Sequence, residues 1–401
     1  MSGIVVVGAG QAGAALCARL RGLGYSGPLT LIGEELAPPY QRPPLSKAYL
    51  LGDMALERLY LRPESFYAET GIDLRLGAPV TGLDRAARTI TVGNETLSYD
   101  QLALTTGSVP RTLPAALGGA LDNVFTVRTI ADVDAMAPHC VAGRRALIVG
   151  GGYIGLEAAA VCAKLGLKVT LLEMADRILQ RVAAPETSTF FRALHRQHGV
   201  DLREGTGLAR LTGDREVTGA LLTDGSEVPA DLVIVGVGIR PATDLAEAAG
   251  LTLDNGIATD AHGRTSDPAI WAAGDCASFP WRGGRLRLES VQNAIDQAEC
   301  VAANMLGAGT DYDPKPWFWS DQYDVKLQIA GLNTGYDRVV VRPEEAGSAS
   351  HWYYAGTTLL AVDAMNAPRS YMVGKRLIEA GRSPDPGAIA DPATDLRSLL
   401  K

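Results

Sequence analysis

Closely spaced cysteines are missing from this chain. Its 5 cysteines are scattered and form no CxxC pair: Cys17, Cys140, Cys162, Cys276 and Cys300. The sequence therefore predicts neither a disulfide framework nor a zinc knuckle, and we expect no metal site.

Basic clusters and long apolar runs are also missing. The formal net charge is −8, and no run of lysine and arginine is interleaved with aromatic residues, which argues against a nucleic-acid partner. No apolar run approaches the length of about 18 residues that crosses a membrane. Residues 1–3 lead into an apolar strand without the features of an export signal. These absences predict a cytoplasmic metabolic enzyme.

The chain does have length and apolar content. With 401 residues, 47% of them hydrophobic, it is expected to fold into about two to three domains with large cores. From about residue 313 the composition becomes aromatic, which marks a separate C-terminal domain.

Two glycine-rich fingerprints are the most informative feature. GxGxxG stands at residues 8–13 after the apolar stretch 4–7, and again at residues 150–155 after 146–149. A glycine run between a strand and a helix lets backbone N–H groups and the helix N-terminus hold a pyrophosphate. Each copy is followed about 20 residues later by a second apolar strand that ends in an acid, Glu34 or Glu173. The pattern predicts two dinucleotide sites; the alternative is two ordinary glycine turns between strand and helix.

The remaining pattern predicts how the first fingerprint's domain is completed. Residues 74–76, 80–83 and 89–92 alternate like a β-meander that returns to the parallel sheet through residues 101–107. The proline-rich residues 38–44 predict an extended loop before a helix near Leu45. A further buried strand at 270–273 ends in Gly274-Asp275.

Several motifs together resemble the two-dinucleotide flavoprotein reductases shaped like glutathione reductase. They are the two fingerprints, Thr105-Thr106-Gly107 and Ala273-Gly274-Asp275. Two longer strings, RPPLSK at 42–47 and WFWSDQY at 317–323, resemble the putidaredoxin reductase group of NADH-dependent ferredoxin reductases. Members of that group supply electrons to cytochromes P450 or ring-hydroxylating dioxygenases.

The resemblance covers essentially the whole chain and implies an α/β fold of two Rossmann-like domains plus an α+β C-terminal domain. The FAD-binding domain is expected at residues 1–111 and 245–312, and the NADH-binding domain is inserted at 112–244. Residues 313–401 would cover the flavin and help to form the ferredoxin docking face. A monomer or weak dimer is expected.

The resemblance also implies roles for individual residues. The expected FAD contacts are Gly8, Gly10, Ala12, Gly13, Glu34, Lys47, Val80, Thr106, Gly107, Arg128, Gly274, Asp275, Val291 and Trp319. The expected NADH contacts are Gly150, Gly152, Tyr153, Ile154, Gly155, Glu173, Gly236 and Gly238. A carboxylate at position 173 repels a 2′-phosphate, so NADH should be preferred over NADPH, although Arg177 lies close in sequence.

Lys47 and Glu157 are the candidate catalytic residues. A lysine at a helix start is unfavourable for the helix dipole and calls for an acidic partner, and the related reductases pair these positions beside the flavin. The alternative is a structural ion pair with no chemical role.

The acceptor of the electrons follows from the resemblance and from the missing thiols. Disulfide reductases of this architecture use a cysteine pair beside the flavin, and the 42–47 loop has no cysteine. A [2Fe–2S] ferredoxin that serves a P450 is therefore expected. Its candidate docking charges are Arg62, Arg282, Arg285, Arg287 and Lys326. The alternatives are a reductase for rubredoxin or a dioxygenase ferredoxin, and a redox-sensing interaction protein that binds FAD and NADH.

Overall fold

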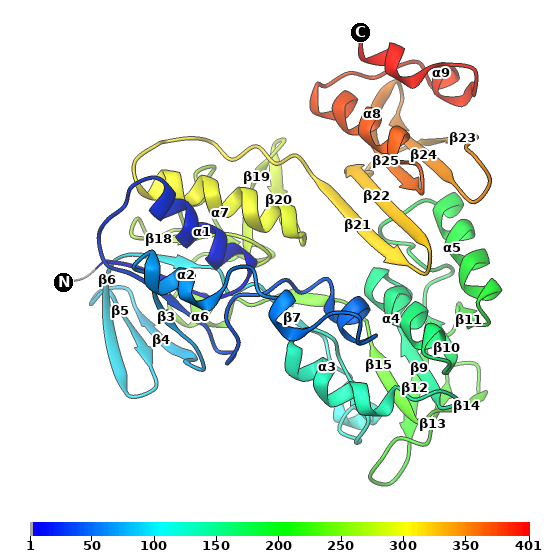
Figure 1. Ribbon diagram of the computed structural model, residues 1–401, viewed down its shortest axis with the longest axis horizontal. Helices are drawn as coiled ribbons and strands as arrows, with labels where there is room; N and C mark the ends of the chain where they lie inside the picture. The colour runs from blue at the N-terminus through cyan, green and yellow to red at the C-terminus, as the bar shows by residue number, and fades with distance from the viewer. Residues whose placement is uncertain (1–2) are drawn as a thin grey trace. The chain divides into compact units, whose positions relative to one another are not determined.

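The chain folds into two units whose segments alternate along the sequence. The computed structural model describes residues 3–401 (Figure 1). The first unit comprises Met1–Arg42, Ala55–Val109 and Ile239–Pro316, and the second comprises Pro43–Met54, Pro110–Gly238 and Trp317–Lys401.

The first unit is built on a mixed sheet that carries the first fingerprint. Its path is β3 (Asp73–Arg75), β2 (Leu29–Ile32), β1 (Gly3–Val7), β6 (Glu95–Leu104), β5 (Thr89–Val92) and β4 (Val80–Asp84), with β18 (Ile270–Ala272) also paired to β6. Strands β3, β2, β1, β6 and β18 pair in parallel with one another. Strand β5 pairs antiparallel with both β4 and β6. The predicted meander is confirmed for β4, β5 and β6.

The predicted place of residues 74–76 is wrong. Leu74 lies in β3, which pairs in parallel with β2 at the edge of the sheet. A three-residue strand carries too little alternation to show which neighbour it joins, and that choice depends on a partner far away in the sequence.

Two cores flank the first sheet because β1 is apolar on both faces. Ile4 and Val6 pack with α1 (Gln11–Gly22) and α7 (Val291–Met305), whereas Val5 and Val7 pack in a second cluster with Leu102. The unit also contains α2 (Glu64–Glu69), α6 (Asp244–Ala248), β7 (Ser108–Pro110), β16 (Ile239–Pro241), β17 (Ile257–Ala258), β19 (Ala277–Trp281) and β20 (Gly284–Leu286).

The second unit carries the second fingerprint on a parallel sheet. The strand order is β11 (Asp201–Glu204), β10 (Lys168–Glu173), β9 (Arg145–Val149), β15 (Leu232–Val235) and β8 (Val124–Phe125). Helices α3 (Ile130–Met136), α4 (Tyr153–Lys164) and α5 (Pro185–Gln197) accompany it, with a small antiparallel sheet of β12 (Leu208–Thr212), β13 (Gly219–Leu222) and β14 (Glu227–Pro229).

The C-terminal part of the second unit is an antiparallel sheet with helices. Its order is β21 (Trp317–Gln322), β22 (Val325–Gly331), β25 (Thr358–Met365), β24 (Ala349–Ala355) and β23 (Arg338–Arg342), followed in the chain by α8 (Pro368–Glu379) and α9 (Pro386–Ala390). Trp352, Val362 and Leu377 are central in its core. The two parallel-sheet regions and this α+β region together confirm the expected fold class.

A buried polar cluster attaches α5 to the C-terminal sheet. The Thr187 hydroxyl donates to Asp363 Oδ2 (2.8 Å) and lies 2.8 Å from His351 Nδ1. The Tyr353 hydroxyl donates to the same Asp363 oxygen and accepts from the Ala184 N–H. Burial raises the pKa of Asp363 to about 6 and lowers the pKa of His351 to about 4. The cluster therefore contributes opposing pH dependences to stability.

The substitution Asp363→Asn should separate these two contributions. Because the folded-state pKa of Asp363 lies above its ordinary value of 3.8, the stability due to its protonated form is lost as pH rises from about 4 through 6. The variant lacks this loss, so between pH 4 and 7 its unfolding free energy should rise relative to wild type, by at most about 3 kcal/mol. Urea unfolding followed by tryptophan fluorescence measures the difference, and parallel curves for the two proteins would contradict the assignment.

Candidate functional site

The two fingerprints adopt the same backbone geometry. Gly8 and Gly150 both have φ +110°, and their N–H groups donate to Ile32 O and Leu172 O, each over 2.8 Å. A Cβ on Gly8 would lie 2.2 Å from Thr105 O, and one on Gly150 would lie 2.4 Å from the corresponding carbonyl, that of residue 236. Only glycine fits these positions, where the loop crosses the carboxyl end of a parallel sheet.

The last glycine of each fingerprint allows the helix to approach the strand. A Cβ would lie 2.1 Å from Gly8 O at Gly13 and 1.9 Å from Gly150 O at Gly155. Close helix–strand packing is the purpose expected of this third glycine.

The middle glycines face open space. Gly10 and Gly152 have ordinary φ values of −94° and −81°, and a Cβ on either would meet nothing within 4 Å. Both are N-cap residues, and neither α1 nor α4 receives a side-chain cap. The first N–H groups of both helices are therefore available to an anion. Each cradle fits the pyrophosphate of a dinucleotide.

Glu173 is fixed beside the second cradle. Its Oε2 accepts from Gly151 N and its Oε1 from Ala175 N, both over 2.8 Å. Glu34 does not occupy the equivalent position beside the first cradle. The Gly8 N–H donates to Ile32 O as the Gly150 N–H donates to Leu172 O, so Ile32 corresponds to Leu172. Gly33 therefore aligns with Glu173, and the exposed Glu34 stands one residue further on.

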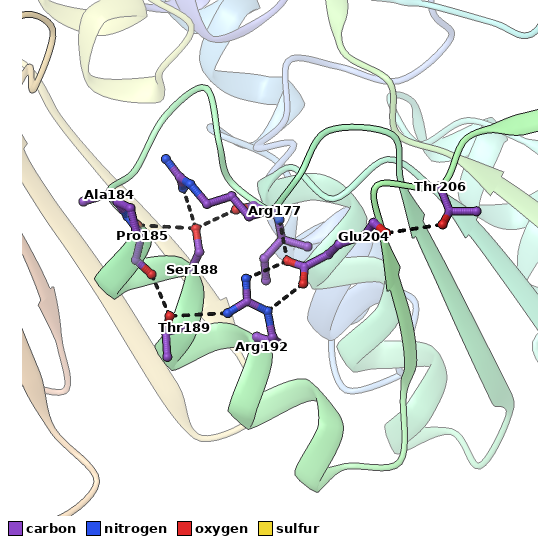
Figure 2. A network of polar contacts seen from close by, with 9 residues as sticks. Arg177, Ala184, Pro185, Ser188, Thr189, Arg192, Glu204 and Thr206 are labelled. Carbon is purple, nitrogen blue, oxygen red and sulfur yellow. Dashed lines mark hydrogen bonds and ion pairs between the residues drawn. The ribbon is translucent and has the colours of Figure 1, made fainter. Parts of the chain in front are cut away.

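Arg177 is held on α5. Its Nη1 donates to Ser188 Oγ over 2.6 Å (Figure 2). Its Nη2 donates to Gln180 O over 3.3 Å. Figure 2 also shows Arg192 of α5 bound to Glu204, at 2.6 and 2.9 Å. These contacts hold the segment after β10 against α5. They also engage Arg177, the residue close to Glu173 in sequence that could otherwise accommodate the 2′-phosphate of NADPH.

Asp275 lies beside the start of α1. The preceding Gly274 has φ +83°, and a Cβ there would lie 3.0 Å from Ala12 Cβ. Its N–H donates to Gln297 Oε1 (2.9 Å), and Ser108 Oγ donates to Asp275 Oδ2 (2.8 Å). Gln297 Nε2 is buried with no partner among the residues that the structure describes, so a donor near the first cradle is left for a ligand.

The other predicted FAD contacts of the first unit are distributed around these groups. Thr106 and Gly107 follow β6, where Thr106 Oγ1 donates to Ala242 O over 2.6 Å. Val291 opens α7 behind the Ser290 cap, as expected, and Val80 opens β4 half-buried. The carboxyl ends of β1, β6 and β18 thus bring together the predicted residues of the first fingerprint, Thr106 and Asp275.

In the second unit the predicted residues surround the start of α4. Gly236 packs on Gly155, since a Cβ on Gly236 would lie 3.4 Å from Gly155 Cα, and Gly238 has φ +103°. The Tyr153 ring packs against Phe318 with centroids 4.9 Å apart and planes tilted by 40°. The Tyr153 hydroxyl has no partner among residues 3–401, and Ile154 is exposed. Arg128 precedes α3, where its backbone N–H donates to Asp132 (2.9 Å).

Lys47 and Glu157 form the expected ion pair. Lys47 Nζ lies 2.9 Å from Glu157 Oε2, and the two side chains are only 17% and 8% exposed. Ser46 Oγ donates to the same oxygen (3.2 Å) and Ser320 Oγ donates to Oε1 (2.8 Å). Sequence reasoning missed both serines, although each belongs to one of the two strings that carry the resemblance.

The helix expected near Leu45 is not regular. Leu45–Tyr49 is a short π-helical segment in which Lys47 has φ −130° and ψ −108°, outside helical values. The helix-dipole argument for Lys47 is therefore wrong, because no regular helix begins there. The reason for its partner is burial, since a buried charge requires an opposite charge or hydrogen bonds.

Trp319 shares one face of β21 with Trp317 and Asp321, whereas Phe318, Ser320 and Gln322 lie on the other face. Its ring is 5.5 Å from that of Trp317, whereas Phe318 contacts Tyr153 and Ser320 contacts Glu157. Alternation along the strand separates these two sets.

Several polar groups differ from expectation. The Cys162 thiol lowers the pKa of Cys140, so these two free cysteines are neighbours in space although far apart in sequence. Arg285 donates to Ser278 and Thr259 within the first unit, and the Arg287 side chain is only 10% exposed. Both arginines thus have partners within the first unit, and their role in docking stays a prediction.

Neither a metal centre nor a membrane-spanning helix is found among residues 3–401. No cluster of three or more histidine, cysteine or acidic side chains is arranged to hold a metal. No helix within this range has the length and apolar character needed to cross a membrane.

Comparisons with known proteins agree with this geometry. Residues 2–298 match the pyridine nucleotide-disulphide oxidoreductase family, and residues 317–400 match the reductase C-terminal family. The chain is 42% identical to putidaredoxin reductase CamA of Pseudomonas putida, over 99% of this chain and 96% of that one. It is 44% identical to the ferredoxin–NAD(P)+ reductase fdr of Sphingomonas sp, over 99% and 97%.

Solved structures give the same result. The crystal structure of the covalent putidaredoxin reductase–putidaredoxin complex matches with a TM-score of 0.96 and 40% identity, over 100% of this chain and 98% of that one. The ferredoxin reductase for the CYP199A2 system from Rhodopseudomonas palustris matches with a TM-score of 0.96 and 38% identity, over 100% of both chains.

The family matches span both cradles and the C-terminal region, and the first-listed relatives are aligned over nearly their entire length. The chain belongs to the pyridine nucleotide-disulphide oxidoreductase family and is an FAD- and NAD(P)H-dependent ferredoxin reductase of the putidaredoxin reductase type.

Proposed function

We propose that this reductase takes a hydride from NADH and passes single electrons to a [2Fe–2S] ferredoxin that serves a cytochrome P450 monooxygenase. The observation that carries the proposal is the pair of open cradles at Gly10 and Gly152, one in each unit. FAD, when bound, supplies the conversion from a two-electron hydride to one-electron transfers. The P450 part rests on the two strings at 42–47 and 317–323. A cytoplasmic monomer or weak dimer is part of the proposal.

The first cradle would hold FAD. Backbone N–H groups at the start of α1 would bind its pyrophosphate, and Glu34 would accept from its adenosine ribose. Asp275 would bind the ribityl hydroxyls, and its carboxylate is oriented by Ser108. The N-terminus of α7 at Val291 would stabilise negative charge on the reduced ring.

The second cradle would hold NADH, with Glu173 as its ribose acceptor. The Glu173 carboxylate is held by two backbone N–H groups and repels the 2′-phosphate of NADPH. Arg177 is engaged with Ser188 and would therefore offer little compensation. The domain boundaries expected from the sequence stay predictions.

Lys47 and Glu157 would orient the reacting rings. The ion pair is largely buried and held by Ser46 and Ser320, so the ammonium can present a fixed charge and donor to a neighbouring ligand. Trp319 would cover the flavin toward the ferredoxin.

A dioxygenase ferredoxin is the second candidate acceptor. Relatives covering 99% of the chain include the reductase component of an anthranilate 1,2-dioxygenase system from Burkholderia cepacia, at 40% identity. Others include terpredoxin reductase and rhodocoxin reductase. The choice of oxygenase is thus the part of the proposal that most needs an experiment.

Anaerobic stopped-flow absorbance tests the proposed function. The FAD-loaded protein is reduced with NADH or NADPH and then mixed with P450-type ferredoxin, dioxygenase ferredoxin, rubredoxin, oxygen or a disulfide. We expect fast bleaching with NADH and fastest transfer to the P450-type ferredoxin. Flavin reduction without transfer to any ferredoxin would contradict the proposal, and faster transfer to another ferredoxin would reassign the partner.

Alanine at the two open glycines should separate the cofactors. Gly152→Ala should weaken NADH binding by at least about tenfold, a loss of about 1.4 kcal/mol, while FAD stays bound. Gly10→Ala should weaken FAD retention instead. Both positions have backbone angles and space that tolerate alanine, so each variant is the folding control for the other. NADH titration and flavin release measure the effects; equal loss of both cofactors in either variant would contradict the assignment.

Glu173→Ala should reduce discrimination between the two nicotinamide cofactors. Removing the carboxylate removes one hydrogen bond to NADH and the repulsion of NADPH, so the NADH to NADPH ratio of kcat/KM should fall about tenfold or more. Arg177→Ala is the matched control and should leave the ratio nearly unchanged. A large fall in NADPH use by the control would mean that Arg177 serves the 2′-phosphate.

A further inference from the structure

The WFWSDQY string contains buried polar residues for which the proposed function has no role. Ser320 and Gln322 alternate on one face of β21, and neither has any exposed surface. Buried polar side chains are nearly always hydrogen-bonded, so their partners indicate what they do.

Their partners form a continuous chain that starts at Glu157. Ser320 Oγ donates to Glu157 Oε1 over 2.8 Å, and Gln322 Nε2 donates to Ser320 Oγ over 3.1 Å. Gln322 Oε1 in turn lies 2.8 Å from Nε2 of His195 on α5. All these residues belong to the second unit.

The charge on Glu157 sets the direction of every hydrogen bond in the chain. A carboxylate only accepts hydrogen bonds, so the single Ser320 O–H must donate to Glu157. The Ser320 oxygen then accepts from the Gln322 amide nitrogen. The amide oxygen then faces His195, which must carry its proton on Nε2. Burial lowers the pKa of His195 to about 4, and the neutral ring can accept at Nδ1 from the Tyr323 hydroxyl, 3.3 Å away.

Tyr323 closes the far end of the chain with a strained backbone. Its φ is +56°, in the left-handed region that a bulky residue rarely adopts. Its ring stacks on the exposed His198, with centroids 3.6 Å apart and planes at 5°. Strain of this kind persists only where surrounding contacts fix it, so the turn between β21 and β22 is held against α5.

This chain of hydrogen bonds fixes the orientation of its side chains and does not transfer protons. An amide N–H does not give up its proton readily, so Gln322 interrupts proton hopping between His195 and Ser320. Glu157 has donors on both oxygens, from Lys47 and Ser46 on one side and Ser320 on the other. With both oxygens engaged, the carboxylate cannot rotate without breaking a hydrogen bond.

We propose that Ser320, Gln322 and His195 are positioning residues that hold the Lys47–Glu157 pair in its working geometry, so that α5 and β21 set the rate of flavin reduction. The inference rests on the proposed role of that pair at the flavin. It gives the buried polar positions of the string a function distinct from covering the flavin.

A matched control is available on α5, the helix that carries His195. Thr187 of α5 also binds the C-terminal sheet, through Asp363, His351 and Tyr353, and within residues 3–401 none of these hydrogen bonds leads to Glu157. Thr187→Val therefore loosens α5 from the sheet and leaves the hydrogen bonds between Glu157 and His195 intact. Ser320→Ala, Gln322→Leu and His195→Phe interrupt the chain at three successive points, so no single folding defect can decide the result.

Two readouts are measured on each FAD-loaded variant. The first is the limiting rate and apparent Kd of flavin reduction by NADH in anaerobic stopped flow. We expect Ser320→Ala and Gln322→Leu to lower the limiting rate about tenfold, the loss of one hydrogen bond to a charged group or its support, with little change in Kd. Ser320→Thr should restore the rate, and Thr187→Val should match wild type.

The second readout does not depend on turnover. Trace acetylation with acetic anhydride, quantified by peptide mass spectrometry, compares Lys47 with an internal reference, Lys375 of α8, which is ion-paired with Glu379. Lys47 should become several-fold more reactive in Ser320→Ala and Gln322→Leu, because rotation of the Glu157 carboxylate would break its ion pair with the Lys47 ammonium. Lys47 should stay protected in Thr187→Val.

The outcomes separate this inference from the proposed function. If Lys47→Ala reduces flavin as fast as wild type, the proposed role of the ion pair fails. If Lys47→Ala is slow while the three chain variants keep the wild-type rate and Lys47 protection, only the positioning inference is overturned. Equal effects in Thr187→Val would also overturn it, since general loosening of α5 would then explain the data.

Discussion

The absence of a side chain where a helix meets a strand is the constraint on which both halves of this protein depend. At Gly13 and Gly155 a methyl group would lie about 2 Å from a backbone oxygen, so any other residue would push the helix away from its sheet. The helix N-terminus would then no longer point at the space beside Gly10 or Gly152. Anion binding by uncapped N–H groups works only within this geometry. The roles proposed for the acidic residues and for the ion pair depend on a dinucleotide held there.

A buried carboxylate organises the rest of the second unit. Glu157 sits on the helix of the nucleotide cradle, and burying its charge is costly unless donors surround it. Those donors come from distant segments, Lys47 from the proline-rich loop and Ser320 from the C-terminal sheet. Glu157 is thus one of the contacts that join Pro43–Met54 and Trp317–Lys401 to the second fingerprint, beside the cluster of Thr187 and Asp363.

Local signals in the sequence were enough to predict most strands and both cradles, whereas the pairing of Lys47 with Glu157 was expected from the family resemblance. Glycine spacing after an apolar strand identified both cradles, because the requirement for glycine is local, at positions such as Gly8 and Gly150. The sequence could not predict the chain through Gln322 and His195, since these residues meet only through tertiary packing. The Cys140–Cys162 contact was missed for the same reason. The irregular segment at Lys47 was missed because a π-helical turn has no distinct sequence pattern.

We propose that one chain holds two dinucleotides in two separate cradles, with the Lys47–Glu157 ion pair oriented at the reacting rings. A crystal structure of the protein with FAD and NAD+ is the decisive measurement. We expect one pyrophosphate on the N–H groups at the start of α1, the other at the start of α4, and Lys47 still paired with Glu157. A dinucleotide bound away from Gly10 or Gly152, or both cofactors absent from the helix N-termini, would contradict it.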